Sequence, residues 1–303
     1  MKRRRPGRAS LSTDGLLLVD KPAGITSHDA VARARRALGE RRIGHHGTLD
    51  PFATGLLVLL VGRATRLAPF LSGEPKVYEA EFSFGVETST DDLTGEIVRQ
   101  APLPSPEAVR EAIVTLTGTF EQLPPAVSAK QVRGERAHAA ARAGRPLELR
   151  PVTITVHEWT VHELTPHRLV ATIRCAGGTY IRALARDLGR ATGGAAHLVA
   201  LRRLASGVFR VEDAIGVDEL QPGVKVPLRS PLDGVPELPR EVLDGEAVAR
   251  IRHGGTIAAT VSGDVGALID DRGGLVAIGE RVREQWQPRV VLQDPGERVA
   301  RDG

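Results

Sequence analysis

Residues Gly44–Gly55 read GHHGTLDPFATG, and this stretch decides how the whole chain is interpreted. Its twelve residues contain three glycines, one proline and a single carboxylate. Gly47 and Gly55 allow backbone conformations that other residues resist, and Pro51 stiffens the chain directly after Asp50. Such a loop presents one side chain in a fixed direction, so Asp50 is a candidate functional group. An ordinary turn, in which Asp50 accepts a hydrogen bond from a backbone amide, explains the same local pattern.

Three further blocks, together with Gly44–Gly55, resemble the motifs of the TruB-family pseudouridine synthases in their order along the chain. The stretch Gly44–Gly55 matches the pattern Gly-His-x-Gly-x-Leu-Asp-Pro-x-Ala-x-Gly of the family's catalytic motif. The resemblance extends from about Gly15 to Arg210, and residues 240–293 resemble, less sharply, the PUA-like domain that follows in bacterial members. The other blocks are 19–28 (VDKPAGITSH), 76–78 (KVY), and a C-terminal block with 175–182 (CAGGTYIR), 187–189 (DLG), 197–198 (HL) and 201–203 (LRR).

The resemblance implies an α/β (α+β) fold. A mixed, largely antiparallel sheet flanked by helices is expected, with the catalytic loop at a central cleft and a small C-terminal PUA-like β-barrel. A cluster of prolines between residues 221 and 240 indicates a linker between two modules. We therefore expect a disordered basic tail over 1–13, a catalytic domain over 14–232 with an RNA-gripping insertion at about 121–150, a PUA-like RNA-binding domain over 240–293, and a tail over 294–303.

Apolar periodicity and turn residues predict the elements around these motifs. In the first part of the chain we expect a buried strand over 15–20, a helix capped by Ser27 that stops at Gly39, a loop from Gly44 to Thr54, a strand over 78–85, an acidic loop over 88–95 and a helix over 105–116. In the second part we expect strands over 152–156 and 168–174, a helix over 181–191, a helix-like segment over 241–252, and three strands around 256–261, 266–270 and 274–279.

Formation of pseudouridine breaks the N1–C1′ glycosidic bond, turns the uracil, joins C5 to C1′ and removes the C5 proton. By resemblance Asp50 is the catalytic carboxylate, which can attack the sugar or the base, or stabilise positive charge at C1′. Arg182 is expected to pair with Asp50 and keep it ionised; a phosphate contact or an ordinary surface charge is the alternative. Tyr78 is expected to stack on the uracil and take the C5 proton; a half-buried core ring is the alternative.

An enzyme that acts on a base must first swing that base out of the stack. The resemblance implies that His45 inserts where the extruded bases had stacked, and that Tyr180 forms a wall of the pocket. It also implies that Leu201 closes the pocket from the other side. The alternatives are an exposed loop histidine, a half-buried core tyrosine and a plain core leucine.

Several cations are candidates for contacts with RNA. Lys21 and Lys76 occupy motif positions, where they are expected either to brace the active-site loop or to meet phosphate. Arg202 is expected to neutralise the RNA backbone, and a solvated surface charge is its alternative. Further candidates of this kind are Arg133, Arg136, Arg142, Arg145, Arg150 and Arg203.

Composition excludes several other kinds of site. The formal net charge of +4 and the pI of about 9.6 permit a polyanionic partner without demonstrating one. A single cysteine, Cys175, rules out an internal disulfide, and the nine histidines lack metal-ligand spacing, so we expect no metal and no cofactor. No apolar run approaches the roughly 18 residues of a membrane span, so we expect a cytoplasmic protein without a membrane partner.

By resemblance, the function is isomerisation of the uridine at position 55 in the T-loop of tRNA, with the T-arm as the bound partner. We expect no guide RNA, no obligate protein partner and a monomer. Three alternatives stay open: a non-catalytic RNA-binding or tRNA-folding protein on the same scaffold, a synthase inside a guide-RNA particle, and a hydrolase that uses Asp50 to release the base.

Overall fold

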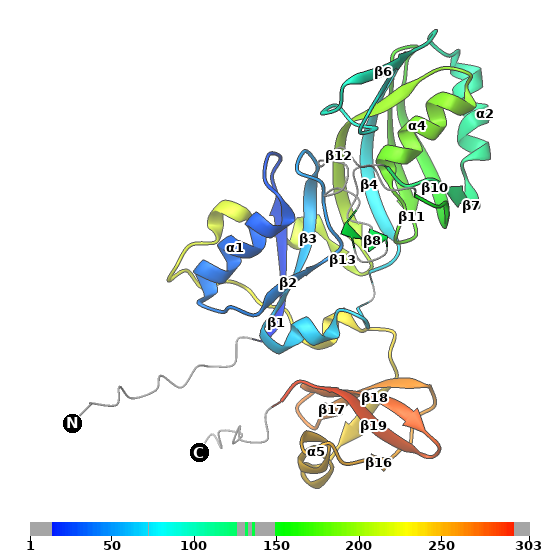
Figure 1. Ribbon diagram of the computed structural model, residues 1–303. Coiled ribbons are helices and arrows are strands. Elements are labelled where there is room, and N and C mark those ends of the chain that lie inside the picture. The colour runs from blue at the N-terminus through cyan, green and yellow to red at the C-terminus, as the bar shows by residue number, and fades with distance from the viewer. Residues whose placement is uncertain (1–13, 72, 126–130, 133–134, 137–148, 294–303) are drawn as a thin grey trace.

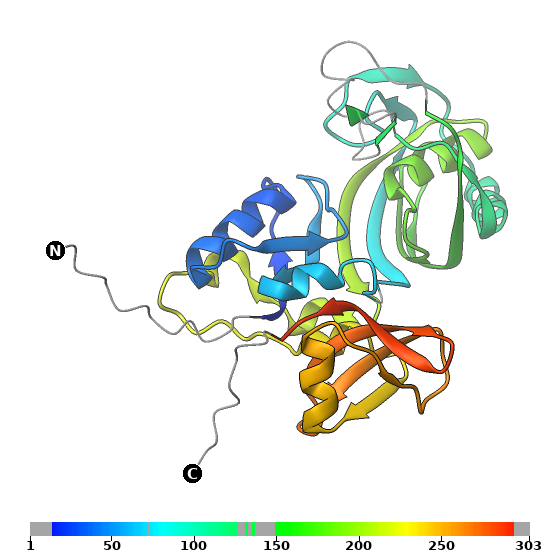
Figure 2. The same cartoon turned by 60° about the horizontal axis from the view of Figure 1, so that its bottom comes forward.

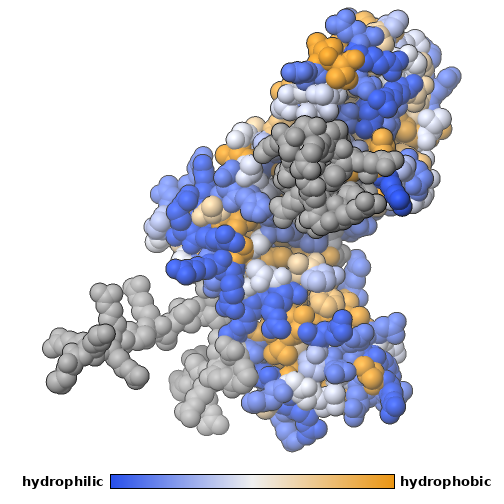
Figure 3. Space-filling model, viewed as in Figure 1, coloured by the Kyte–Doolittle hydropathy of each residue, from blue (hydrophilic) through white to orange (hydrophobic). Residues whose placement is uncertain are grey.

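The computed structural model describes residues 14–71, 73–125, 131–132, 135–136 and 149–293. The tails expected over 1–13 and 294–303 lie outside these residues, as does most of the insertion expected at about 121–150. Among the described helices, none combines the length and the hydropathy that a transmembrane span requires. Hydrophilic residues dominate the face seen in Figure 3, with apolar patches scattered between them.

A ten-stranded sheet forms the larger part of the molecule. Its path runs β14-β1-β3-β12-β4-β11-β10-β7, with β2 on β3 and β13 on β12. Pairing is antiparallel except between β1 and β14 and between β3 and β12, so the predicted mixed, largely antiparallel sheet is confirmed. The strands are β1 (Gly15–Lys21), β2 (Ile43–His46), β3 (Thr54–Val61), β4 (Lys76–Phe84), β7 (Gly118–Gln122), β10 (Val152–Leu164), β11 (Arg168–Cys175), β12 (Ala196–Ser206), β13 (Phe209–Arg210) and β14 (Ile215–Gly216).

Helices lie against both halves of this sheet, as Figure 1 shows. Helix α1 (Ser27–Leu38) lies against β1 and β2, and helix α4 (Ile181–Ala191) lies against β12 and β4. Helix α2 (Pro106–Thr115) contacts α4. Two short hairpins, β5 (Val86–Thr88) with β6 (Ile97–Gln100) and β8 (Gln131–Val132) with β9 (Glu135–Arg136), lie outside the main sheet.

The start of α1 differs from the prediction in a way that matters for the site. Thr26, not Ser27, is the N-cap, because its side chain accepts a hydrogen bond from Asp29 N while Asp29 accepts one from Thr26 N. Ser27 is buried instead, and its hydroxyl bonds both N–H and C=O of Leu49. The helix ends as predicted at Gly39, which has a left-handed backbone.

A second, five-stranded sheet follows near the C-terminus, in the order β15-β17-β18-β19-β16. The helix-like segment expected over 241–252 is wrong in its first part: residues 240–243 alternate between exposed and buried and form a strand, and Asp244 then caps helix α5. The elements are β15 (Arg240–Leu243), α5 (Gly245–Arg252), β16 (Ile257–Ala258), β17 (Val265–Asp270), β18 (Leu275–Val282) and β19 (Gln285–Val291).

The two sheets share one apolar cluster, which joins side chains of β1 and β3 to side chains of β17 and β18. Figure 2 shows the second sheet, with α5 beside it, directly below the first. Arg63 and Arg66 of the short helix η1 (Gly62–Leu67) donate hydrogen bonds to the carbonyl oxygens of Leu292 and Val291 at the end of β19. Apolar packing, together with hydrogen bonds from arginine side chains to backbone carbonyl oxygens, therefore holds the C-terminal sheet on the larger one.

Candidate active site

The loop that carries Asp50 connects β2 to β3 and depends on its glycines. Gly47 and Gly55 have φ angles of 77° and 98°, a region that side-chain-bearing residues rarely adopt. A Cβ atom at Gly55 would also collide with the backbone of Arg203, since β3 and β12 pair at this point. The expectation of a loop from Gly44 is wrong at its start, because residues 44–46 belong to β2. That strand pairs with β3 and thereby fixes both ends of the loop.

Three side chains bind the backbone of this loop from outside it. Lys21 is fully buried, and its ammonium group donates to the carbonyl oxygens of Pro22 (2.9 Å), Ile25 (2.8 Å) and Pro51 (3.3 Å). Burial lowers the pKa of Lys21 to about 8, an effect that Asp50 partly opposes. Because the amine is buried and already bonded, the structure favours the bracing role of Lys21 over a phosphate contact.

Ser27 and Arg203 bind the same loop at other points. The Ser27 hydroxyl bonds Leu49 N (3.0 Å) and Leu49 O (3.1 Å), directly before Asp50. Arg203 donates from Nε to Leu56 O (2.7 Å) and from Nη2 to Gly47 O (3.0 Å). Arg203, which the sequence placed among candidates for phosphate contacts, is fully buried, so that prediction is wrong.

Asp50 and Arg182 form the pair that the sequence resemblance implies, and the structure shows that it is bidentate. Arg182 Nε lies 2.8 Å from Asp50 Oδ2, and Arg182 Nη2 lies 3.1 Å from Oδ1. The Arg182 side chain is 6% exposed while that of Asp50 is 35% exposed. Two parallel N–H···O bonds fix the direction of the carboxylate. Helix α4 supplies Arg182 from its first turn, so the helix axis sets where the fork points.

Asp92 is a third member of this network that sequence reasoning missed. Its Oδ2 lies 3.3 Å from Nη1 of Arg182, which also donates to Thr90 O at 3.0 Å. Asp92 is buried and accepts further hydrogen bonds from Thr90 and from Thr94. The sequence indicated only a polar, acidic loop over 88–95. The adjacent acids Asp91 and Asp92 were the only sign in the sequence of a functional carboxylate there, and nothing in the sequence paired either of them with Arg182.

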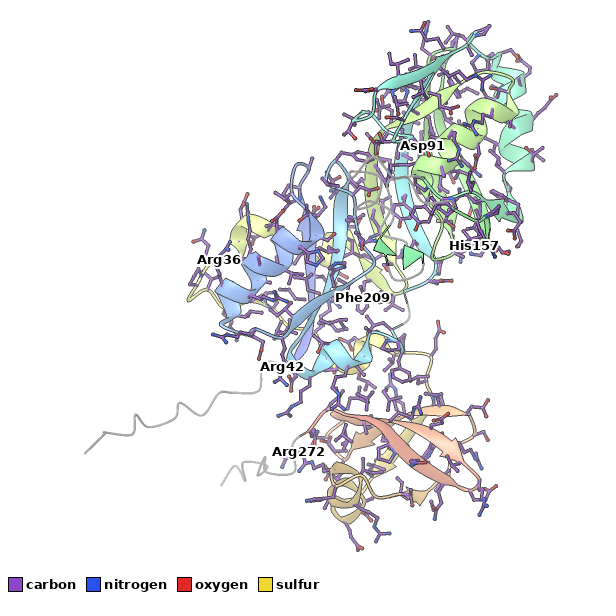
Figure 4. The ribbon with its side chains drawn as sticks, in the orientation of Figure 1. Arg36, Arg42, Asp91, His157, Phe209 and Arg272 are labelled. Atoms are coloured by element: carbon purple, nitrogen blue, oxygen red, sulfur yellow. The ribbon has the colours of Figure 1, made fainter. Side chains whose placement is uncertain are left out.

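Arg182, the partner of Asp92, is the first of three arginines that follow one another at intervals of four residues along α4, the others being Arg186 and Arg190. Arg186 Nη1 lies 2.9 Å from Asp91 Oδ2, and Arg190 pairs with Glu87. Burial raises the pKa of Asp91 to about 6, although Arg186 opposes the shift. Asp91 has a φ of 61°, and Figure 4 shows it beside α4. One helix face thus anchors the loop between β5 and β6 next to Asp50.

A pocket of about 240 Å³ opens in front of Asp50. Six residues predicted for the site line it together, from β4, β12, α4 and the loops before α4 and β3. They are Asp50, Lys76, Tyr78, Tyr180, Arg182 and Leu201.

The side-chain amide of Gln122 holds the backbone of Tyr180. Its N–H donates to Gln122 Oε1 (3.0 Å), and its C=O accepts from Gln122 Nε2 (3.2 Å). Gln122 is fully buried at the end of β7. Sequence reasoning missed both the strand and this residue. Because Tyr180 is the N-cap of α4, the amide of Gln122 also positions the helix that carries Arg182.

Two pocket residues have altered acid–base properties. Tyr78 is 7% exposed, and burial raises the pKa of its hydroxyl, while the neighbouring Arg203 opposes that shift. Burial and the charge of Arg203 lower the pKa of Lys76.

His45 and Arg202 are not among the residues that line the pocket. The His45 ring lies on β2 in an edge-on contact with His28 at 5.4 Å between centroids, and burial lowers its pKa, which favours a neutral imidazole. Arg202 pairs with Asp20 at 3.0 and 2.7 Å and is partly exposed. Of the other candidates for RNA contacts, Arg133, Arg142, Arg145 and the side chain of Arg136 lie outside the described residues. In the parts of the chain that are described, no group of three or more His, Cys, Asp or Glu side chains is arranged to hold a metal ion.

Known proteins are similar to this chain over most of its length. Two protein-family models match the chain. The family described as TruB family pseudouridylate synthase (N terminal domain) matches residues 35–181, and the family described as tRNA pseudouridylate synthase B C-terminal domain matches residues 182–230. The tRNA pseudouridine synthase B of Thermobifida fusca is 45% identical over 291 residues, 92% of this chain and 98% of its own. The tRNA pseudouridine synthase B of Bacillus cereus is 40% identical, and the alignment covers 80% of this chain and 83% of the relative.

Solved structures with the same fold include an H/ACA RNP bound to a substrate RNA containing 2'-deoxyuridine. The alignment has a TM-score of 0.70 at 23% sequence identity and covers 93% of this chain and 86% of that chain. The likeness to this structure shows the fold alone. The family models, and the sequence identity over nearly the whole length of the relatives, show the family as well. This chain belongs to the TruB family of pseudouridylate synthases.

Proposed function

We propose that this chain isomerises one uridine of tRNA to pseudouridine, at position 55 in the T-loop, with Asp50 as the catalytic carboxylate. The observation that carries the proposal is the partly exposed carboxylate of Asp50, held by the buried fork of Arg182 at the mouth of a small pocket. Relatives named tRNA pseudouridine synthase B, at 45% identity, support tRNA as the substrate. The T-loop position comes from the motif resemblance.

In this proposal the uridine leaves its stack and enters the pocket as a single nucleoside. Asp50 faces its C1′ and acts on the glycosidic bond, either by attack or by stabilising positive charge. The ring of Tyr78 packs on the detached uracil, and its oxygen takes the C5 proton. Tyr180 and Leu201 close the pocket around the ring while it turns. His45, just outside the pocket, fills the gap in the RNA stack.

We further propose that residues 14–232 form the catalytic domain and that 240–293 form a PUA-like RNA-binding domain. The chain acts as a monomer in the cytoplasm, without a guide RNA and without a protein partner. The likeness to the H/ACA RNP structure, at 23% identity, supports a shared fold and carries no argument for shared partners. Recognition rests on RNA shape and phosphate contacts outside the pocket.

The purified chain is tested alone on a bare tRNA transcript. We expect one pseudouridine per transcript after nuclease digestion, an unchanged RNA mass, and no product when cytidine replaces uridine at position 55. A transcript that loses the mass of a base would indicate a hydrolase. Absence of product until other proteins and a guide RNA are added would indicate a guided synthase.

Asp92→Asn is expected to lower the single-turnover rate on the order of 10²-fold with little change in tRNA affinity. Asparagine keeps the shape of Asp92 but removes the charge that holds Nη1 of Arg182, so the fork that aims Asp50 loosens. Rates are measured with enzyme in excess, and affinity by filter binding. Glu87→Gln, at the far end of the same arginine row, is the matched control and should cost less than about tenfold. Equal effects of the two substitutions would contradict the assignment.

A further inference from the structure

Arg203 is a buried cation whose surroundings do not explain its charge. It is fully buried, and its hydrogen bonds within the described part of the chain go to two carbonyl oxygens rather than to a carboxylate. Its Nη1 atom is buried and has no hydrogen-bond partner among the described residues. Removing a charge from water without a counter-ion is expensive, and an unpartnered buried donor adds to the expense. Packing alone therefore does not explain why a charged side chain occupies this buried position.

Tyr78 lies on the strand next to this charge. Strands β12 and β4 pair in a register that places Arg203 directly opposite Tyr78. Directly opposed residues in an antiparallel pair point to the same face, with their side chains in contact range. The Nη1 atom of Arg203 lies against Gly47 in the loop that carries Asp50, where a Cβ would come within 3.1 Å of it.

The charges around Tyr78 show why this cation matters. Burial raises the pKa of the Tyr78 hydroxyl, and Cys175 and Asp50 act in the same direction, whereas the charge of Arg203 lowers it. A neutral phenol is a poor acceptor for a carbon-bound proton, and a phenolate in a buried site is costly unless a cation stabilises it. Lys76 lies near the same position, within 3.4 Å of where a Cβ of Gly47 would be.

We propose that Arg203 is a positioning residue for proton removal, because its guanidinium stabilises the phenolate of Tyr78 that accepts the C5 proton of uracil. This inference rests on the proposed function. Tyr78 first loses its proton to solvent. After C5 has joined C1′, the C5–H bond breaks and its electron pair forms the C5=C6 double bond, while the proton moves to the phenolate oxygen. The electron pair of the C6=N1 double bond moves at the same time onto N1, which takes a proton from solvent in place of the one that Tyr78 released. Atoms and electrons balance without any co-reactant.

The competing explanation is that Arg203 only fastens the loop through Gly47 and Leu56. Ser27 provides the matched control, because its hydroxyl fastens the same loop at Leu49. Unlike Arg203, Ser27 is not on a strand next to Tyr78. Ser27→Ala therefore loosens the loop around Asp50 and leaves the surroundings of Tyr78 in place.

Single-turnover rates are measured on transcripts with protium or deuterium at C5 of the target uridine, for the wild type, Arg203→Gln, Arg203→Lys and Ser27→Ala. We expect Arg203→Gln to slow product formation on the order of 10²-fold and to raise the deuterium isotope effect above that of the wild type. Arg203→Lys should recover part of the rate and lower the isotope effect again, because the charge returns. Ser27→Ala should slow the reaction without raising the isotope effect. The same isotope effect in Arg203→Gln and Ser27→Ala would overturn the proposal.

A second measurement covers the case in which the Arg203 variants do not fold. The chain has only two tyrosines, so Tyr180→Phe leaves Tyr78 as the single phenol. Its ionisation is followed by phenolate absorbance, and folding by circular dichroism, during one pH titration. We expect Tyr78 to ionise reversibly while the chain is still folded, and ionisation only on unfolding would refute the role of Arg203. Because no RNA is present, this result is independent of whether the proposed function holds.

Discussion

Replacing Asp50 with asparagine is expected to reduce pseudouridine formation by on the order of 10⁴-fold or more, while tRNA affinity changes by less than about tenfold. Asparagine fits the same space, and its amide oxygen can still accept a hydrogen bond from Arg182. It is neutral, so it neither attacks the nucleoside nor stabilises positive charge at C1′. The loss therefore falls on the transition state and spares binding. Single-turnover rates and filter binding of the same variant separate the two quantities.

Asp20 offers a matched control for this substitution. It forms the same kind of bidentate pair with an arginine, at 3.0 and 2.7 Å from Arg202, but outside the residues that line the pocket. Asp20→Asn is expected to keep the rate within about tenfold of the wild type, since partly exposed ion pairs contribute little. Turnover of Asp50→Asn near the rate of Asp20→Asn would remove Asp50 from the mechanism.

Replacing Arg182 with methionine is expected to have the second largest effect. The substitution leaves the carboxylate of Asp92 buried without its cation, which costs about 3–5 kcal/mol in the free energy of unfolding. It also frees Asp50 to rotate, so the rate should fall by on the order of 10³-fold. Arg182→Lys should recover more stability than rate, because an ammonium restores the charge but not the two-point geometry. Thermal melts and single-turnover rates are the two measurements.

Arg190→Met is the control for this prediction. Arg190 lies two helical turns further along α4 and pairs with Glu87, but about half of its side chain is exposed. Because Glu87 is buried as well, we expect a comparable loss of stability but less than about tenfold in rate. If Asp50 and Arg182 act as a unit, the double variant Asp50→Asn with Arg182→Met should be no slower than Asp50→Asn alone. Fully multiplicative losses would show that the two residues act separately.

The parts of the fold that the sequence predicted are those whose signals are local. The apolar positions of α1, with Gly39 after them, and the run of residues 181–191 placed two helices, since periodicity and stop signals lie within each segment. Ser27 was misplaced as a cap because the choice between adjacent threonine and serine depends on Leu49, which approaches only in the folded chain. Strands β7 and β19 were missed because neither segment has a regular apolar pattern.

The candidate site divides in the same way. Asp50, Tyr78 and Arg182 were found because each lies in a motif, and the structure brings them to one pocket. Asp92, Gln122 and the buried charge of Arg203 act through partners more than thirty residues away, so no spacing in the sequence pointed to them. Lys21 was named, but its bracing role was open until burial and three carbonyl contacts were known.

Release of tritium from a T-arm transcript labelled at C5 of its uridines tests the central claim most directly. The claim is that the pocket in front of Asp50 takes one uridine and exchanges its C5–H bond for a C5–C1′ bond. We predict that the purified chain releases one tritium per RNA, that mapping places pseudouridine at position 55 alone, and that Asp50→Asn releases none. Release without pseudouridine, or equal release by Asp50→Asn, would contradict the account.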